Sequence, residues 1–212
     1  MSREAQASNP LRVHALLEAS AANGPGERVV IWLQGCTLDC PGCWNPATHE
    51  RAGGFERSVE DILAWLKAVR SRAGVAGLTI SGGEPMEQAA GLLELLVGVR
   101  RRVHSFSIGL FSGYSEGELE RGRYRCFPDA TAFEKRGLWR SIRRTLDFAV
   151  LGRYNARAPS SDPLATSKNQ RLRLYSDRYS PADFKPQLVE ATIDPHGLTQ
   201  LSGFPMSGKL TE

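Results

Sequence analysis

Three of the four cysteines in this 212-residue chain, Cys36, Cys40 and Cys43, fall within eight residues of one another. They directly follow residues 28–33 (Arg-Val-Val-Ile-Trp-Leu), a β-branched apolar run that predicts a buried strand. A secreted disulfide scaffold would instead spread an even number of cysteines along the chain. We therefore expect reduced thiols that bind a metal, in a loop at the end of a strand.

The cysteine spacing, Cys-x3-Cys-x2-Cys, is compatible with more than one metal centre. Soft thiolates select zinc, copper(I) or an iron–sulfur cluster. Structural zinc requires four ligands, and His49, six residues after Cys43, is the candidate fourth ligand. A cubane cluster on three cysteines leaves one iron open to bind a small molecule, which favours a catalytic cluster. Three buried structural thiols without a metal are a further alternative.

Strand and helix patterns alternate along most of the chain. This alternation predicts an α/β fold with a parallel sheet, and in such folds the chemistry belongs at the carboxyl ends of the strands. Residues 11–17 fit either a strand or a short helix. The other predicted strands are 28–33, 78–80, 105–111, 148–151, 172–175 and 188–193, with a hairpin arm at 197–202, and the main predicted helices are 58–72, 86–102 and 129–146.

Two further segments fall at predicted strand ends. The first is Ser81-Gly82-Gly83-Glu84-Pro85, in which two glycines let the backbone approach a ligand closely and the proline suits the start of a helix. An ordinary strand–helix turn is the alternative. The second is Ser112-Gly113-Tyr114, where the serine hydroxyl suits contact with a ribose, although a capped turn explains it as well.

These motifs together resemble the radical S-adenosylmethionine (SAM) enzymes. The cysteine spacing followed by the aromatic Trp44 is similar to their signature. Other segments resemble the glycyl-radical-enzyme activases, most closely the type that activates anaerobic ribonucleotide reductase. The resemblance covers roughly residues 11–175 and includes Gly24-Pro25-Gly26-Glu27-Arg28, Gln34-Gly35-Cys36, Cys43-Trp44-Asn45-Pro46, and segments 78–85, 112–119 and 167–171.

The resemblance implies a partial (β/α) barrel of the radical SAM type, with a parallel sheet and an open side, in a single domain over residues 1–212. It implies a [4Fe-4S] cluster on Cys36, Cys40 and Cys43, with SAM bound to the open iron. The cluster would cleave SAM to a 5′-deoxyadenosyl radical, which abstracts hydrogen from a glycine of a partner glycyl radical enzyme. The SAM-binding residues that it implies are Trp44, Asn45, Ser81, Gly82, Gly83, Glu84, Ser112 and Arg153.

The chain departs from the activase pattern in two places. Leu151 and Arg153 stand where activases commonly carry an acidic residue and a lysine. Segment 165–171 keeps the family's Ser, Asn, Gln and Arg but lacks its Arg-Gly start. Two alternatives therefore stay open: a standalone radical SAM enzyme that acts on a small molecule or peptide, and a zinc-stabilised binding module without catalysis.

Composition limits where the protein acts. The formal net charge of +4 does not by itself indicate a nucleic-acid partner. No run approaches the ~18 apolar residues that span a bilayer, and residues 1–10 lack the pattern of a signal peptide. We therefore expect a cytoplasmic protein of anaerobic metabolism, with no membrane partner, whose first ten residues form a flexible tail.

Two segments suggest contacts with other molecules. The polar stretch 155–170 is long for a connection, and such loops often serve as lids or substrate loops. An arginine-rich region over 121–144 is either a solvated helix face or a contact surface for an acidic partner. The resemblance further implies a one-electron donor such as flavodoxin or ferredoxin.

Overall fold

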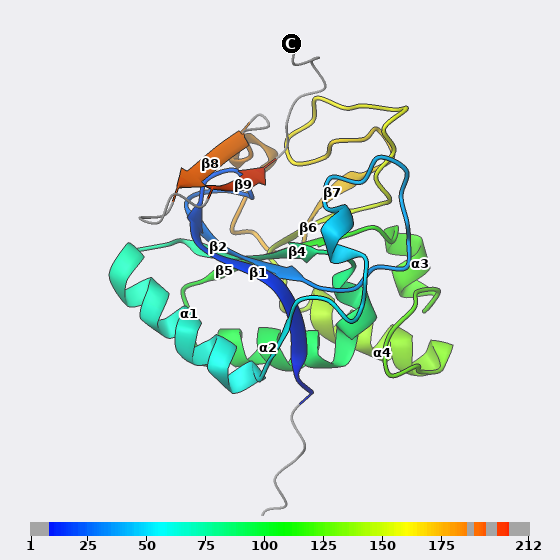
Figure 1. Cartoon of the computed structure of the whole chain (residues 1–212), viewed down its shortest axis with the longest axis horizontal. Coiled ribbons are helices and arrows are strands. Elements are labelled where there is room, and N and C mark those ends of the chain that lie inside the picture. The colour runs from blue at the N-terminus through cyan, green and yellow to red at the C-terminus, as the bar shows by residue number, and fades with distance from the viewer. Residues whose placement is uncertain (1–8, 186–188, 194–198, 204–212) are drawn as a thin grey trace, which may run out of the picture.

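A computed structural model describes residues 9–185, 189–193 and 199–203. In these residues a seven-stranded sheet has the order β3-β1-β2-β4-β5-β6-β7 (Figure 1). The four inner strands are parallel, as the sequence predicts, so their carboxyl ends meet at one edge of the sheet. These strands are β2 (Arg28–Leu33), β4 (Gly77–Gly82), β5 (Ser107–Ser112) and β6 (Phe148–Leu151).

The outer strands add antiparallel edges to the predicted parallel sheet. β1 (Leu11–Ser20) pairs antiparallel with β2, which also settles residues 11–17 as a strand. β3 (Phe55–Arg57) pairs antiparallel with β1, and β7 (Arg171–Leu174) with β6. Because β3 and β7 end the strand order and do not pair with each other, the sheet has the predicted open side.

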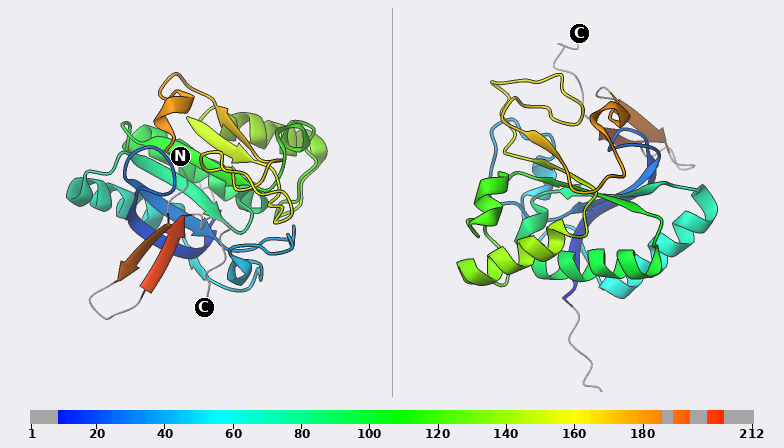
Figure 2. Two further views of the ribbon diagram at one scale, coloured as in Figure 1. Left: turned by 90° about the horizontal axis from the view of Figure 1, so that it is seen from above. Right: turned by 180° about the vertical axis from the view of Figure 1, so that it is seen from behind.

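The helices and the remaining strands cover opposite faces of the sheet. Figure 1 shows α1, α2 and α4 against one face, while the β8–β9 hairpin and the 155–170 loop lie over the other. Figure 2 shows the same division from above and behind. The bounds are α1 (Val59–Ala73), α2 (Ala89–Arg102), α3 (Glu116–Glu120), α4 (Ala132–Arg143), β8 (Val189–Ile193), β9 (Thr199–Gly203) and the 3-10 turns η1 (Pro46–Thr48), η2 (Pro85–Gln88) and η3 (Pro181–Asp183).

Some predicted segments fall where the structure gives no description. Residues 1–8 of the predicted tail, Leu188 of a predicted strand and residues 197–198 of the predicted hairpin arm lie outside the described residues. Among the described residues, no helix is both long enough and apolar enough to pass through a bilayer.

Side-chain caps set where the helices begin. The Ser58 hydroxyl accepts the Asp61 N–H at the start of α1. Thr131 and Glu134 form a capping box at the start of α4, which is why this helix begins later than the predicted residue 129. The predicted helix from Met86 is also corrected, because residues 85–88 form the 3-10 turn η2 before α2 begins.

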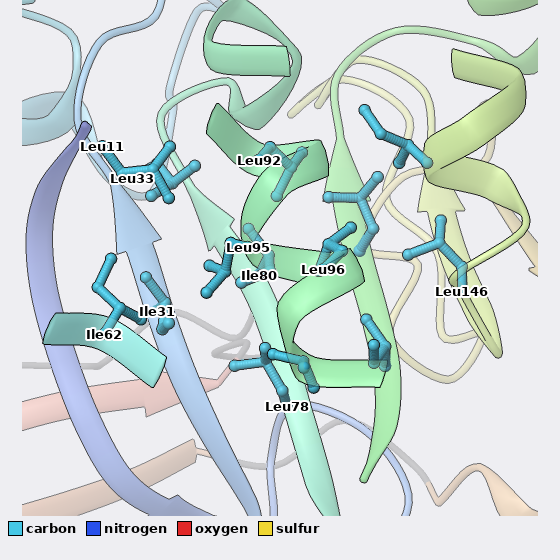
Figure 3. Close-up of a cluster of buried hydrophobic side chains, with 14 of the residues drawn as sticks. Leu11, Ile31, Leu33, Ile62, Leu78, Ile80, Leu92, Leu95, Leu96 and Leu146 are labelled. Carbon is cyan, nitrogen blue, oxygen red and sulfur yellow. The ribbon is translucent and has the colours of Figure 1, made fainter. Parts of the chain in front are cut away.

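The main core lies between the sheet and its helices. Leu92, Leu95 and Leu96 of α2 point toward Ile31 and Leu33 of β2 and toward Leu78 and Ile80 of β4 (Figure 3). All seven side chains are fully buried, as the helical spacing on α2 and the continuous apolar runs of the strands predict.

The opposite face of the sheet carries smaller apolar clusters. Phe148 and Val150 of β6 pack with Leu164 and Ala165 from the 155–170 loop and with Phe184. The long polar loop is therefore anchored over the sheet by an apolar contact with β6.

Candidate active site

The cysteine loop leaves the carboxyl end of β2 and folds back on itself. The backbone N–H of Gly35 donates to the Thr48 carbonyl at 2.8 Å, and that of Cys36 donates to the His49 carbonyl at 3.0 Å. The buried Gln34 side chain closes the base of the loop by donating to the carbonyls of Ala47 and Glu50. These bonds hold the cysteine segment at the sheet edge where the parallel strands end.

All three loop cysteines are half-buried free thiols. Burial raises the pKa of Cys36 to about 12, and burial also raises the pKa of Cys40. At neutral pH a metal must therefore displace a proton from these groups. Backbone N–H groups of Leu38 and Asp39 favour the Cys36 thiolate, and the Asn45 N–H donates to the Cys43 sulfur at 3.4 Å.

This donor set fits an iron–sulfur cluster, because three sulfur atoms on one loop receive hydrogen bonds that stabilise anionic ligands. His49, the candidate fourth ligand of a zinc site, has its Nδ1 atom 3.6 Å from the Asp39 carboxylate, and its Nε2 atom is buried without a partner. In the described part of the chain, no three His, Cys, Asp or Glu side chains gather as they would around a single metal ion.

The Gly82-Gly83 turn packs against the cysteine loop. Gly82 pairs with Leu33 across β4 and β2, and the Gly83 N–H donates to the Leu33 carbonyl at 2.8 Å. A Cβ atom at Gly83 would stand 2.3 Å from the Gly35 carbonyl oxygen. These glycines therefore allow the turn to approach the backbone beside Cys36 closely. This packing fixes the cysteine loop.

Glu84 joins the same turn to the next strand end. Its fully buried carboxylate accepts the Met86 N–H at 2.9 Å and the Ser112 hydroxyl at 2.8 Å through Oε1. Its Oε2 atom accepts the Gly113 N–H at 2.7 Å. Burial raises the pKa of Glu84 to about 7 despite these three donors. Glu84 thus fixes both turns, and its role as a SAM contact stays a prediction.

Three other predicted SAM contacts surround this edge. Trp44 is 42% exposed, and its ring lies 5.6 Å from that of Tyr154. Asn45 caps η1 with its backbone carbonyl, which accepts the Thr48 hydroxyl at 2.7 Å. Ser81 stands opposite Trp32 in the pairing of β4 with β2. Trp44 is thus not a core residue, and all three side chains remain predicted contacts.

Arg153 lies at the end of β6 but already has a partner. Its guanidinium pairs with the Glu118 carboxylate at 2.8 Å and lies 5.3 Å from the centre of the Tyr114 ring. Leu151, at the position where activases carry an acid, is buried in the main core beneath the sheet. An acidic side chain there would be buried among apolar groups, so the leucine suits this chain's packing.

The 155–170 loop is fastened by the segment that resembles the activase pattern. The buried Ser167 hydroxyl accepts the Asn155 N–H at 2.8 Å. The Gln170 amide donates to the Gly152 carbonyl at 3.2 Å, and the Asn169 amide donates to the Arg153 carbonyl at 2.6 Å. These side chains therefore shape the loop.

The loop also reaches the cysteines. A Cβ atom at Gly42 would stand 3.4 Å from the Ala156 Cβ, and the Tyr154 backbone N–H favours the Cys40 thiolate. The sequence patterns do not single out Tyr154, because nothing in its local pattern shows that the end of β6 meets the cysteine loop. The site therefore brings together all four parallel strand ends.

Comparison with known proteins decides the family. A model of the 4Fe-4S single cluster domain matches residues 22–173. The chain belongs to this family. It is 32% identical over 123 residues to the anaerobic ribonucleoside-triphosphate reductase-activating protein of Vibrio cholerae, covering 56% of this chain and 78% of that protein. The namesake from Escherichia coli is 30% identical over 51% of this chain and 73% of its own length.

Other relatives match a smaller region. The pyruvate formate-lyase-activating enzyme of Listeria monocytogenes is 38% identical over 87 residues, which is 39% of this chain but only 34% of that enzyme. The crystal structure of QueE from Escherichia coli aligns with a TM-score of 0.41 and 20% identity, over 61% of this chain and 63% of that one. This 4Fe-4S family member is a radical SAM enzyme with a [4Fe-4S] cluster and SAM as its cofactors.

Proposed function

We propose that this radical SAM enzyme generates a glycyl radical on a partner enzyme, as an activase of the anaerobic ribonucleotide-reductase-activating type. The match to the Vibrio cholerae activating protein over 78% of that protein carries this proposal. When bound, the reduced cluster would supply one electron to SAM, which would break into methionine and a 5′-deoxyadenosyl radical able to take a hydrogen atom. Everything else must come from the chain: binding, orientation and exclusion of water.

In this proposal Cys36, Cys40 and Cys43 hold three irons. The backbone of Gly82, Gly83 and Glu84 receives the methionine end of SAM, beside the half-exposed Ser81. The second bond of Glu84 to Ser112 keeps that turn rigid. A preorganised turn costs no reorganisation when the ligand binds.

Other side chains would contact the remainder of SAM. Trp44 and Asn45 flank the adenine side, and Ser112 lies at the ribose side. Arg153 offers a planar fork to the SAM carboxylate. Because Arg153 is paired with Glu118, it must exchange that partner for the ligand.

The 155–170 loop is the proposed substrate loop. It is anchored over the sheet through Leu164 and Ala165 and lies beside the cysteine loop through Ala156. In this position it would help to keep solvent from the site, which would protect a primary radical from side reactions. The target glycine would enter along its edge, through the open side of the sheet.

The partner would be steered by charge. Arg121, Arg123 and Arg125 are exposed, and the Arg125 N–H donates to the Tyr114 hydroxyl at 3.0 Å, which places this arginine-rich loop beside the site. An acidic partner would then associate at a rate that falls with rising salt. A one-electron donor such as flavodoxin or ferredoxin is the proposed source of reducing equivalents.

The test is anaerobic reconstitution, followed by mixing of the reduced protein with SAM and the candidate glycyl radical enzyme. We expect 5′-deoxyadenosine in solution and a glycyl-radical doublet on the partner in its electron paramagnetic resonance (EPR) spectrum. Many turnovers of a small molecule without any partner would overturn the activase proposal and favour a standalone radical SAM enzyme. Stoichiometric zinc without iron would favour the binding module.

A further inference from the structure

The short turn η2 (Pro85–Gln88) makes separate contacts with several strand-end loops. Gln88 donates its amide to the carbonyls of Arg12 and Gln34, both at 2.9 Å. Glu84, its cap, accepts donors from the Ser112-Gly113 turn. Glu87 extends to the cysteine loop. This turn and its cap residue therefore fix the loops around the site relative to one another.

Glu87 accepts hydrogen bonds from the cysteine loop at the residue that follows its first cysteine. The Oε1 atom accepts both the backbone N–H of Thr37, at 2.8 Å, and the Thr37 hydroxyl, at 2.6 Å. Thr37 directly follows Cys36 in the chain. The same carboxylate oxygen thus fixes the backbone and the side chain of the residue that sets where the Cys36 sulfur stands.

Glu87 itself is rigidly held. Only 2% of the residue is exposed. Its backbone N–H donates to the Glu84 carbonyl at 3.0 Å, and its carbonyl accepts the Phe127 N–H at 2.7 Å. A side chain with a fixed backbone and little solvent places its charge at a defined position, where it is weakly screened.

The arginines near Glu87 do not neutralise the charge of its carboxylate through a direct ion pair. Arg12 and Arg51 line the same cavity of about 230 Å³, together with Glu56. Arg12 donates to the carbonyls at 52 and 53, and Arg51 stacks 3.7 Å from the centre of the Phe127 ring. Within the described residues, no ion pair joins Glu87 to either arginine.

We propose that Glu87 is a positioning residue for the cluster: it anchors the Cys36 end of the loop through Thr37, and its carboxylate keeps the cluster harder to reduce. The inference rests on the proposed cluster ligands. Fe–S reduction potentials depend on nearby charge and on hydrogen bonding at the ligands. A buried negative charge disfavours the more negative, reduced cluster.

The first test separates charge from geometry by replacing Glu87 with Gln, which keeps an oxygen acceptor for Thr37 and removes the charge. The midpoint potential is measured by EPR-monitored titration of the reconstituted protein without SAM or partner. We expect wild-type iron content and a midpoint potential less negative than that of the wild type. Glu60→Gln is the matched control, because Glu60 is an exposed carboxylate on α1 that pairs with Arg102 of α2.

The second test removes the anchor. Glu87→Leu and Thr37→Val each delete hydrogen bonds from opposite sides of the contact, so a folding defect in one does not decide the outcome. We expect both to lose iron faster than the wild type during anaerobic desalting, with Glu87→Leu the faster. Thr37→Ser, which keeps both donors, should retain iron as the wild type does.

The results test the electrostatic role and the anchoring role of Glu87 separately. A Glu87→Gln potential equal to that of the wild type and of Glu60→Gln overturns the electrostatic role. Wild-type iron retention in both Glu87→Leu and Thr37→Val overturns the anchoring role. If the wild-type protein itself takes up no [4Fe-4S] cluster, the proposed function fails instead, and the two failures are therefore distinguishable.

Discussion

The Ser112 hydroxyl donates a hydrogen bond of 2.8 Å to the carboxylate of Glu84. This bond crosses from the end of β5 to the turn after β4, and both residues are buried. It is one of three donors on a carboxylate whose pKa burial nevertheless raises to about 7. Glu84 therefore changes protonation close to neutral pH, and it lies in the turn that links the ends of β4 and β5.

Glu84 makes the stability of the protein pH-dependent. A folded pKa near 7 against an ordinary value of 4.5 means that the folded state holds the proton more tightly. The stability contribution is therefore full below pH 4.5 and is lost as the pH rises toward 7. By linkage the loss amounts to about 3 kcal/mol over this window, as an upper estimate.

The measurement compares the wild type with Glu84→Gln by anaerobic urea unfolding between pH 5 and 8. The difference in unfolding free energy between the two proteins should shift in favour of the variant as the pH rises, because Gln has no proton to lose. A difference that stays constant across this range would show that Glu84 keeps one protonation state.

Gly83→Ala should damage the cluster as well as SAM binding. The added Cβ would meet the Gly35 carbonyl oxygen at 2.3 Å and the Thr48 carbonyl oxygen at 3.0 Å, and both belong to backbone that cannot easily move. We expect reduced iron content after reconstitution, along with weaker SAM binding by calorimetry. Normal iron with weakened SAM binding would instead mean that the glycine faces the ligand.

Gly137→Ala is the matched control for that change. Gly137 lies inside α4, and nothing stands within 4 Å of where its Cβ would be. Alanine in a helix interior should stabilise the protein by up to about 1 kcal/mol. Iron content and SAM affinity should equal those of the wild type.

Alanine substitutions should distinguish the three proposed cluster ligands from the fourth cysteine. Replacing Cys36, Cys40 or Cys43 with Ala removes a proposed cluster ligand, so iron, sulfide and SAM cleavage should all be lost. Cys126 is buried in the main core near Tyr124, and Cys126→Ala should keep the cluster. Iron and sulfide analysis of the four variants is the measurement. Full iron in a Cys43→Ala protein would contradict the assignment.

Arg28 should be a stability residue. It is fully buried, and its guanidinium donates to the Thr79 and Ser107 hydroxyls and to the carbonyls of Pro25 and Leu78. Burial lowers the pKa of Arg28 to about 10, so it stays charged at neutral pH. Arg28→Met leaves buried carbonyls unpaired and should cost on the order of 3 kcal/mol in urea unfolding.

The Arg28 result needs its own comparison. Arg28→Lys keeps a cation but cannot serve acceptors in several directions, so its stability should be intermediate. Cluster content should follow stability in both variants, because Arg28 lies at the amino end of β2, opposite the cysteine loop. Selective loss of SAM cleavage in a stable Arg28→Met protein would contradict a purely structural role.

Local patterns were sufficient to predict the parallel strands and the cysteine loop. Continuous apolar runs such as 28–33 and the spacing of Leu92, Leu95 and Leu96 report burial directly. The antiparallel partner of β2 was not predictable in the same way, because strand direction depends on which distant segments meet. The contact of Glu87 with Thr37 joins residues fifty positions apart, so no local pattern contains it.

The sequence also does not show which side chain a predicted ligand residue pairs with in the fold. The resemblance implies Arg153 as a ligand for SAM, whereas the structure shows it paired with Glu118, thirty-five residues away. Similarly, segment 167–170 resembles a functional pattern, but its described contacts fasten a loop. A motif indicates that a side chain has a role, whereas the contacts that define this role depend on the fold.

Ser167→Ala should loosen the proposed substrate loop without affecting the cluster. The Ser167 hydroxyl accepts the Asn155 N–H at 2.8 Å and joins the two ends of the loop. Losing a buried hydrogen bond costs about 1–3 kcal/mol, so amide hydrogen exchange over 155–166 should quicken by about tenfold or more. Iron content should stay unchanged, because the cysteine loop keeps its own bonds to residues 48 and 49.

The functional consequence is a change in coupling between SAM cleavage and hydrogen abstraction. A loop that opens more often admits water, so Ser167→Ala should release more 5′-deoxyadenosine per glycyl radical formed on the partner. Ser71→Ala is the control, because Ser71 is an exposed serine on α1 whose hydroxyl donates to the Lys67 carbonyl. If Ser167→Ala shows faster exchange but an unchanged ratio of 5′-deoxyadenosine to glycyl radical, the loop does not shield the site. If exchange is also unchanged, the Leu164 and Ala165 contacts with β6 hold the loop without the serine.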